Sequence, residues 1–400
     1  MRRKEIVGFC LYDFGDSAFA VLFPFVYGTY YAEQVVGGAR GAGWWGAVGS
    51  VSMLAVALGA PLLGGIADHA GVRKRMLALF TLLGVAASLS FAAITPGLVL
   101  LGFLAGVVAN FAFEGGIVFY NAYLPIIAPP SHHGRISAAG FAVGYVGSLL
   151  AIGAAALLRD WTLIWVAMGL QWLLFALPAI LFLPADRPTG MGVLAAGREG
   201  VRNTLATWRD VLGMIDLRRF LLAYFFYMDG VNTVILFAGL YAAREFGFTT
   251  GELLALIALV QVTALVGSVA MAKPTDTRGP KWSVRVMLLW WILVVGSAFL
   301  ATNRAIFWGV AVLAGLGVGS IQASSRALMS RLVPAGREAE MFGFYALCGK
   351  SGAILGPFLF GQIGEAFGSL RPAILSVAAF YVIGFLLLGR VSVPGRGAEG

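Results

Sequence analysis

The chain has 400 residues, of which 60% are hydrophobic and only 12% are charged, and its mean hydropathy is +0.87. A soluble protein of this composition would leave too much apolar surface in water, so the composition excludes a soluble globular domain. The net charge of +9 does not indicate nucleic-acid binding, because the basic residues are distributed between apolar runs and not clustered on a folded face. The two cysteines, Cys10 and Cys348, lie far apart in apolar stretches, so we expect neither a disulfide framework nor a metal site.

Twelve apolar runs, each long enough to cross a bilayer, follow one another along the chain. The first six are predicted at residues 6–31, 43–66, 76–94, 98–127, 137–157 and 161–183. The second six are predicted at residues 219–242, 252–272, 284–301, 305–330, 341–364 and 371–389. The polar, arginine-rich stretch 184–218 is predicted to be a cytoplasmic linker. The expected fold class is therefore an all-α membrane protein with twelve transmembrane helices in two pseudo-symmetric six-helix bundles, 1–183 and 219–400.

The positive charges are distributed unequally between the two sides of these spans. Of the 28 Lys and Arg residues, 22 fall on one side and five on the other, and Lys350 falls inside a span. Because cytoplasmic loops carry the excess of Lys and Arg, both termini are predicted to be cytoplasmic, in a multi-pass protein of the cell membrane.

A short pattern occurs at equivalent places in the two halves, which indicates a duplicated architecture. The pattern is D-x-x-G-x-basic, and its two copies begin 208 residues apart. It consists of Asp68, Gly71 and Arg73 after the second span, and of Asp276, Gly279 and Lys281 after the eighth span.

The first copy resembles the signature loop of the major facilitator superfamily, although Val72 stands where that superfamily usually has a basic residue. The matching motif is Gly64-x-x-x-Asp68-x-x-Gly71-x-Arg73-Lys74. Other segments are similar to a narrower group, the UMF1 or Atg22-like transporters. They include Tyr12-Asp13-Phe14-Gly15-Asp16-Ser17, Phe113-Glu114-Gly115, Phe119-Tyr120-Asn121-Ala122, Asp229-Gly230-Val231-Asn232-Thr233 and Phe342-Gly343-Phe344-Tyr345. Gly15 and Asp16 depart from that group, which usually has Ala and Asn there.

This resemblance implies a facilitator that works by alternating access, and Atg22-like members are associated with amino-acid export from the vacuole. It also implies that Asp68 contacts the start of span eleven near Glu340 and Met341. By the repeat, Asp276 would contact the start of span five near Ser137. Such contacts break when the cytoplasmic side opens, so both copies of the pattern are predicted to act as conformational latches. The alternative is ordinary loop capping, since a carboxylate also stabilises a neighbouring helix start.

Five ionisable side chains fall inside predicted spans, where charge is costly and usually faces a cavity. They are Asp13, Asp16, Glu114, Asp229 and Lys350. Asp13 and Asp16 share one helical face, and their repulsion favours a proton on one of them. The carboxylates are therefore candidates for binding substrate or protons, and Asn121 and Asn232 are uncharged candidates. The alternatives are solvation for Asp13 and interhelical hydrogen bonds for the asparagines.

Lys350 has two interpretations. It either receives a substrate carboxylate or neutralises one of the buried acids in a structural pair. If both signs of charge line one cavity, the site suits a zwitterion such as an amino acid.

No catalytic residue, metal site or cofactor is expected. The pair His132-His133 has no nearby third ligand, and the glycines from Gly315 to Gly319 follow no strand. The function predicted is secondary active transport, by a monomer, of a small polar solute. An exported amino acid is the first choice, with coupling to protons through Asp16, Glu114 or Asp229. A drug, sugar or metabolite exporter is the alternative within transport. A membrane enzyme, a scramblase or a non-transporting receptor is the alternative of a different class.

Overall fold

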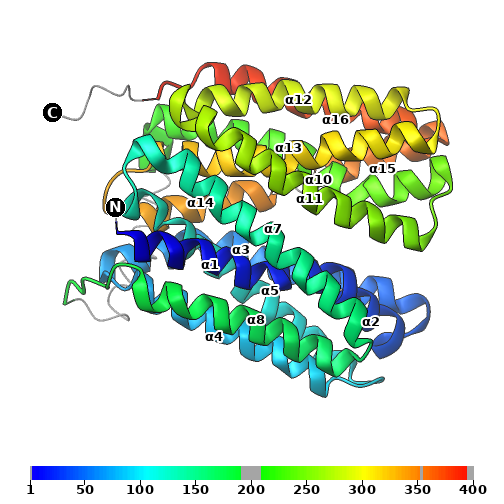
Figure 1. Ribbon diagram of the computed structural model, residues 1–400, viewed down its shortest axis with the longest axis horizontal. Coiled ribbons are helices and arrows are strands. Elements are labelled where there is room, and N and C mark those ends of the chain that lie inside the picture. The colour runs from blue at the N-terminus through cyan, green and yellow to red at the C-terminus, as the bar shows by residue number, and fades with distance from the viewer. Residues whose placement is uncertain (1, 191–208, 352–354, 394–400) are drawn as a thin grey trace. The chain divides into compact units, whose positions relative to one another are not determined.

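The structure is a computed structural model that describes residues 2–190, 209–351 and 355–393. Every regular element within these ranges is a helix (Figure 1). Eleven helical segments of the described chain are long and apolar enough to cross a membrane. The remaining predicted span, 341–364, corresponds to α14 (Glu338–Ser351) and α15 (Leu355–Phe367). Part of that span, 352–354, and part of the predicted linker, 191–208, lie outside the described residues.

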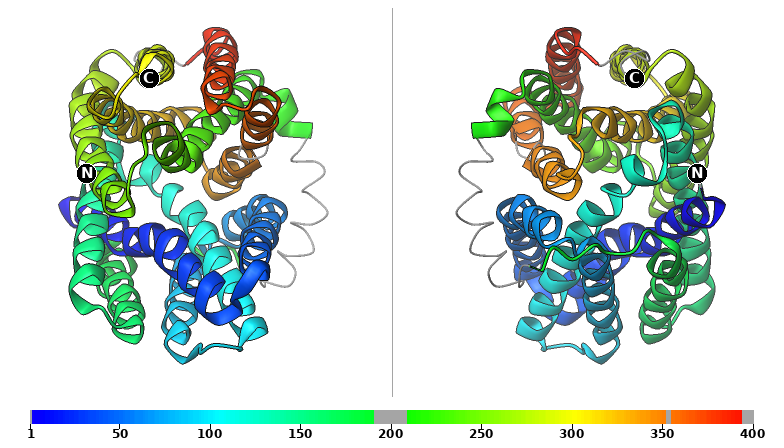
Figure 2. Two further views of the ribbon diagram at one scale, coloured as in Figure 1. Left: turned by 90° about the vertical axis from the view of Figure 1, so that its right-hand side faces the viewer. Right: turned by 90° about the vertical axis from the view of Figure 1, so that its left-hand side faces the viewer.

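The chain forms two compact units, and each contains a segment from the opposite half of the sequence. The first unit comprises residues 1–127, 143–204 and 335–346. Its helices are α1 (Arg3–Leu22), α3 (Gly41–Ala70), α4 (Arg73–Ser90), α5 (Val99–Asn121), α8 (Trp161–Phe182), most of α7 (His133–Leu158) and the start of α14. Within it α1 packs on α8, and α4 packs on α5 and α8. The end-on views of Figure 2 look largely down these helices, as expected of a bundle.

The first span widens into two π-helical segments beyond α1, Phe23–Tyr27 and Tyr31–Val36. The first contains Pro24, which has no backbone N–H to donate, so a regular α-turn could not be completed there. The rings on this face repeat every four residues and stack along the helix, with centroids 4.6 Å apart for Phe19 and Phe23 and 5.7 Å apart for Phe23 and Tyr27. This aromatic column forms the core of the first unit.

The second unit comprises residues 128–142, 205–334 and 347–400. Its helices are α10 (Ile215–Phe246), α11 (Thr250–Thr277), α12 (Pro280–Leu300), α13 (Arg304–Leu332), α15, α16 (Leu370–Gly389), the start of α7 and the end of α14. Here α11 packs on α13, while α16 packs on both α10 and α12. The N-terminus of α11 carries a capping box, in which Thr249 and Glu252 satisfy each other's backbone N–H groups.

One lysine in each unit binds the C-terminal carbonyls of the unit's last long helix. Lys74 donates to the carbonyls of Leu181 and Leu183 after α8. Lys281 donates to those of Gly389 and Val391 after α16, and these acceptors lie 208 residues beyond their counterparts. A cation there is stabilised by the negative end of the helix dipole. The contact therefore follows the same repeat as the D-x-x-G pattern.

The start of the linker crosses the ends of α3 and α4, and Figure 2 shows it as a green extended segment in the right-hand view. The carboxylate of Asp186 accepts the backbone N–H groups of Lys74 and Arg75, at 2.6 Å and 3.2 Å. Thr189 donates its hydroxyl to the carbonyl of His69 at 2.8 Å. The carbonyl of Arg187 would be only 2.0 Å from a Cβ placed on the preceding loop's glycine, Gly71. The first linker residues are therefore part of the folded first unit.

Candidate functional site

Two tyrosine hydroxyls form hydrogen bonds near Asp13 in the first half of α1. The hydroxyl of Tyr120, on α5, lies 2.7 Å from Oδ2 of Asp13 and 2.9 Å from the carbonyl oxygen of Phe9. Tyr12 is hydrogen bonded to Thr81 of α4 at 3.0 Å, and its ring stacks on that of Tyr120. Asp13 is only half-buried. Its carboxylate is thus held by a hydroxyl donor from α5.

Three more candidate residues of the first unit are buried. Asp16 lies one turn after Asp13 on α1, while Glu114 and Asn121 lie on α5. Each of these side chains is less than a tenth exposed and makes interactions within the protein. The shared helical face of the two α1 acids therefore does not give them the same environment, because Asp16 is buried more deeply than Asp13.

The remaining candidates lie in the second unit, on α10 and α14. Asp229, on α10, is completely buried, and its Oδ2 accepts the backbone N–H of Gly356 in α15 at 2.9 Å. The other oxygen, Oδ1, has no hydrogen-bond partner among the described residues. Asp229 therefore combines an anchored oxygen with an unsatisfied one.

The side chains around Asp229 connect α10 to α14. Asn232 donates from Nδ2 to the carbonyl of Gly349 at 3.2 Å. Lys350, the next residue, is half-buried and interacts within the protein. The structure thus brings Asp13, Asp16, Glu114 and Asn121 into one unit, and Asp229, Asn232 and Lys350 into the other.

Asp68 lies in the last turn of α3, not in the loop after it, and binds the start of α14. Its Oδ1 and Oδ2 accept the backbone N–H groups of Ala339 and Glu340, at 3.2 Å and 2.9 Å. Arg73 donates to Asp68 and also to Glu338, and the carboxylate of Asp68 is almost completely shielded from solvent. This arrangement joins a buried charge to two N–H groups at a helix N-terminus, where they have no partner inside the helix.

Two glycines allow α3 and α14 to come this close. A Cβ on Gly64 would lie 2.2 Å from the carbonyl oxygen of Ala339, and a Cβ on Gly343 would lie 2.5 Å from that of Ala60. Neither side-chain atom fits without moving a backbone. The approach of the two helices, and with it the contact made by Asp68, depends on these two residues.

Asp276 has the same geometry in the second unit. It lies in the last turn of α11, and its two oxygens accept the backbone N–H groups of Gly134 and Arg135 at the start of α7, at 2.8 Å and 3.2 Å. The guanidinium of Arg135 also approaches Oδ2, at 3.3 Å. Asp68 binds the N–H of Glu340, one of the two residues named from the sequence, whereas Asp276 binds the first turn of α7 slightly before the position near Ser137.

The other residues of the two patterns are not equivalent. Gly71 has φ +64° and is covered by the linker, whereas Gly279 has φ +94°, and a Cβ there would have no described atom within 4 Å. Arg73 binds the acid of its own pattern, whereas the contacts of Lys281 are to the carbonyls after α16. The glycines terminate α3 and precede α12 in backbone conformations that other residues rarely adopt.

Sequence reasoning gave Arg326 no part in the site, yet this arginine of α13 is buried in the second unit. It donates to the hydroxyl and the carbonyl of Ser137, at 2.9 Å and 2.8 Å, and lies 4.2 Å from the ring centroid of Phe141. The residue thereby fixes the first turns of α7. The sequence signal that could have identified Arg326 is the presence of an arginine within an apolar run.

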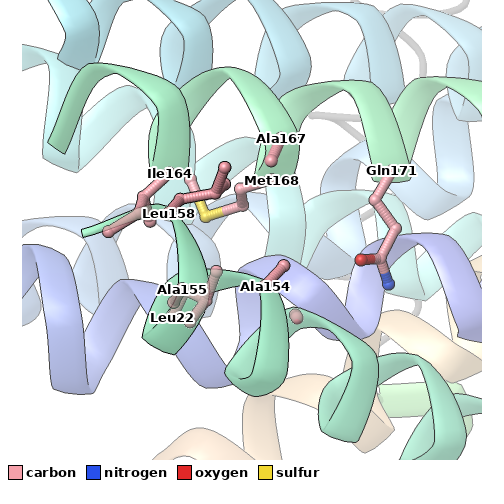
Figure 3. A pocket seen from close by; sticks show the side chains of 9 residues that line it. Leu22, Ala154, Ala155, Leu158, Ile164, Ala167, Met168 and Gln171 are labelled. Atoms are coloured by element: carbon pink, nitrogen blue, oxygen red, sulfur yellow. The ribbon is translucent and has the colours of Figure 1, made fainter. Parts of the chain in front are cut away.

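The first unit contains a small pocket among α1, α7 and α8 (Figure 3). Its lining is mostly alanine and larger aliphatic residues, namely Leu22, Ala151, Ala154, Ala155, Leu158, Ile164, Ala167, Met168 and Gln171. The amide nitrogen of Gln171 is used to bind the carbonyls of Phe14 and Gly147, each at 3.0 Å. None of the candidate site residues lines this pocket, so it is not a candidate substrate site.

Comparison with solved structures shows the fold. The human organic anion transporter MFSD10 superposes with a TM-score of 0.78 at 16% identity, over 97% of this chain and 100% of that chain. The Escherichia coli fucose:proton symporter FucP superposes with a TM-score of 0.74 at 15% identity, over 98% of each chain. Both are transporters, and FucP is a major facilitator superfamily protein. The described helices therefore form the twelve-helix major facilitator fold.

Sequence comparison shows the family. The family described as "Vacuole effluxer Atg22 like" matches residues 46–134 and 129–399. The uncharacterized MFS-type transporter YxiO of Bacillus subtilis is 30% identical over 97% of this chain and 95% of its own length. Autophagy-related protein 22-1 of Aspergillus niger is 21% identical over 83% of this chain and 70% of its own. The chain thus belongs to the Atg22-like family of major facilitator superfamily transporters.

Proposed function

We propose that this transporter exports a small polar solute, an amino acid, and that proton movement drives the export. The family description as a vacuole effluxer supports movement of a solute across a membrane. Proton coupling has a precedent in the fold, because FucP is named a fucose:proton symporter. The observation that carries the proposal is the environment of Asp229.

Asp229 is suited to take up and release a proton. A carboxylate without full hydrogen bonding is costly in a buried site, so protonation of the unsatisfied Oδ1 would remove most of that cost. The anchored Oδ2 would keep its bond to Gly356 in either protonation state. A side chain that keeps its place while its charge changes can couple proton binding to the position of α15.

Candidate residues of both signs support an amino acid as the solute. Asp16 and Glu114 are acids that could receive a substrate ammonium group, and Lys350 could receive its carboxylate. Asn121 and Asn232 would supply neutral hydrogen bonds. Amino acids carry both charges at neutral pH, so they match acids and a cation better than sugars do.

Transport by purified protein in proteoliposomes tests the proposal. Labelled amino acids should leave the vesicles faster when a pH gradient is imposed, and Asp229→Asn should abolish that dependence. Asp160→Asn is the matched control, because Asp160 caps α8 on the surface and asparagine caps a helix equally well. Efflux rates that are the same with and without the pH gradient would refute proton coupling. Transport of a sugar or drug with no amino-acid flux would refute the substrate.

We further propose that Asp68 and Asp276 are latches of the alternating-access cycle, together with Gly71, Arg73, Gly279 and Lys281. The matching geometry supports this role, since each acid reaches a helix that comes from the other half of the sequence. A helix start held by two hydrogen bonds is a contact that can be made in one state and lost in another.

The protein is proposed to act as a monomer in the cell membrane with both termini in the cytoplasm. The distribution of 22 basic residues against five supports this orientation. Labelling of single cysteines placed in the termini of the protein in intact cells, with a reagent that does not cross membranes, measures the orientation. Labelling before lysis would contradict it.

A further inference from the structure

The start of α12 carries a cluster of positive charge beside the end of α16. Lys281 and Arg285 stand one helical turn apart on α12. Lys281 donates to the carbonyls of Gly389 and Val391, and Arg219 of α10 donates to that of Arg390 at 2.9 Å. Two of these cations are therefore occupied by the C-terminal end of α16.

Arg285 is different, because the described residues supply no acceptor for it. Its guanidinium lies over the ring of Phe385, 4.5 Å from the centroid, and its Nε is buried without a hydrogen-bond partner in the described chain. The acid of this region, Asp216, accepts the backbone N–H of Ser392 at 2.7 Å and lies 3.8 Å from Arg219. A guanidinium has five N–H donors, and a half-buried one needs acceptors for them.

The repeat shows that the fold itself does not require an arginine here. In the register that relates the two D-x-x-G patterns, Arg285 corresponds to Leu77 on α4. Leu77 is completely buried in the first unit. The same register relates the carbonyls bound by Lys74 to those bound by Lys281, so the two sites are structurally equivalent. The second unit therefore carries an additional cation at a position that tolerates leucine.

Apolar side chains continue from this cation along both helices. Leu289 and Leu293 follow it on α12, and Val382 and Leu386 flank Phe385 on α16, each between 43% and 64% exposed. Arg285 itself lies about 7.5 Å along α12 from Pro280, at 1.5 Å per residue. In the predicted orientation this is the cytoplasmic end of the span, where headgroups meet acyl chains. An exposed apolar strip below a cation matches a phospholipid, which has a phosphate above a hydrocarbon chain.

We propose that Arg285 binds the phosphate of an anionic phospholipid whose acyl chain lies on the α12 and α16 strip. The guanidinium presents paired donors that match phosphate oxygens. The face of Phe385 holds the guanidinium plane from the other side. A free phosphate would satisfy the guanidinium but would leave the apolar strip without an occupant.

Native mass spectrometry of the full-length protein tests this site. The protein is purified in detergent and titrated with phosphatidylglycerol or phosphatidylcholine. The wild type should retain phosphatidylglycerol preferentially. Arg285→Gln and Arg285→Leu should each lower that preference about fivefold, the effect of one basic residue at an anionic membrane surface. Leucine is included because its counterpart Leu77 fills the same position in a folded unit.

Arg75→Gln is the control, since it removes an exposed charge at the corresponding end of α4. This variant should leave the preference for phosphatidylglycerol unchanged. Inorganic phosphate in about 10-fold excess over lipid should not displace the bound lipid. An unchanged preference in both Arg285 variants would overturn the proposal. An equal loss in Arg75→Gln would show a general surface-charge effect and overturn it too. Displacement by phosphate would overturn the lipid as the ligand and replace it with a free anion.

Discussion

Replacing Asp68 by asparagine changes one oxygen of the α3–α14 contact into an amide and removes its charge. The native carboxylate accepts two N–H groups of α14, at 3.2 Å and 2.9 Å, and a hydrogen bond from Arg73. The asparagine has the same shape but only one oxygen to accept hydrogen bonds. Glu338 also accepts a hydrogen bond from Arg73, but it cannot replace the Asp68 carboxylate on the N–H groups of α14 without moving.

The size of the effect follows from these bonds. A hydrogen bond to a charged group contributes about 1.5–3 kcal/mol, so the loss of one is expected to weaken the contact by about 2 kcal/mol. This corresponds to about a 30-fold change in the ratio of separated to closed states. A separated state present in about one molecule in a hundred would rise to about one in four.

Spin labels at Arg75 and Ala335 measure this ratio, because both positions are exposed and lie in the first unit. Double electron–electron resonance should show a second, longer distance in Asp68→Asn. Asp160→Asn provides the control, since asparagine caps α8 as well as aspartate does and should leave the distance between these two labels unchanged. An unaltered distance distribution in Asp68→Asn would refute the reasoning that this carboxylate holds α14.

Three further substitutions test other contacts by thermal unfolding of the purified protein. Gly343→Ala places a Cβ 2.5 Å from a backbone carbonyl of α3 and should lower stability by about 1–3 kcal/mol, whereas Gly239→Ala, with no described atom within 4 Å, should not. Tyr120→Phe removes the donor to Asp13 and should lower stability by about 1–3 kcal/mol; an unchanged Tm would mean that this hydrogen bond is replaced by water. Thr249→Ala removes the N-cap of α11 and should lower stability by about 1 kcal/mol, while Thr249→Ser should retain it.

The membrane spans could be predicted because the bilayer imposes their length and composition. The sixth, predicted at 161–183, is the helix Trp161–Phe182. The fifth begins at His133, four residues before its predicted start at 137. Its polar first turn lacks an apolar signal, and the bonds from Asp276 to Gly134 and Arg135 help to hold that turn. Polar helix starts that are stabilised by distant residues are hard to recognise from local composition.

The repeat predicted which acids are equivalent but not where their neighbours lie. Asp68 and Asp276 were assigned to loops, whereas both lie in a last helical turn, and the chain changes direction only at the glycines that follow. The basic residue of the second pattern, Lys281, binds the end of α16, as Lys74 binds the end of α8. Lys74 and Lys281 bind equivalent carbonyls although they lie one residue out of register with the repeat. Tertiary contacts decide such a shift, and they leave no periodic signal in the sequence.

The predicted span 341–364 covers most of α14 and α15, and its residues 352–354 lie outside the described residues. Asp229 was selected from the sequence as a charge inside a span, and its hydrogen bond to Gly356 of α15 became evident only from the fold. Sequence reasoning could identify the costly residue but not the backbone donor that binds it.

The contacts of Asp68 and Asp276 make each half of the chain depend on the other half. Asp68 draws its N–H donors from residues 339 and 340, and Asp276 draws its own from residues 134 and 135. Neither acid finds its backbone N–H donors in its own half, although Arg73 of the first half also donates to Asp68. A fragment ending within the linker would expose one buried carboxylate and one uncapped helix start, and its partner fragment would expose the complementary pair. The duplicated halves are thus chemically interdependent, and co-expressed fragments should accumulate only together.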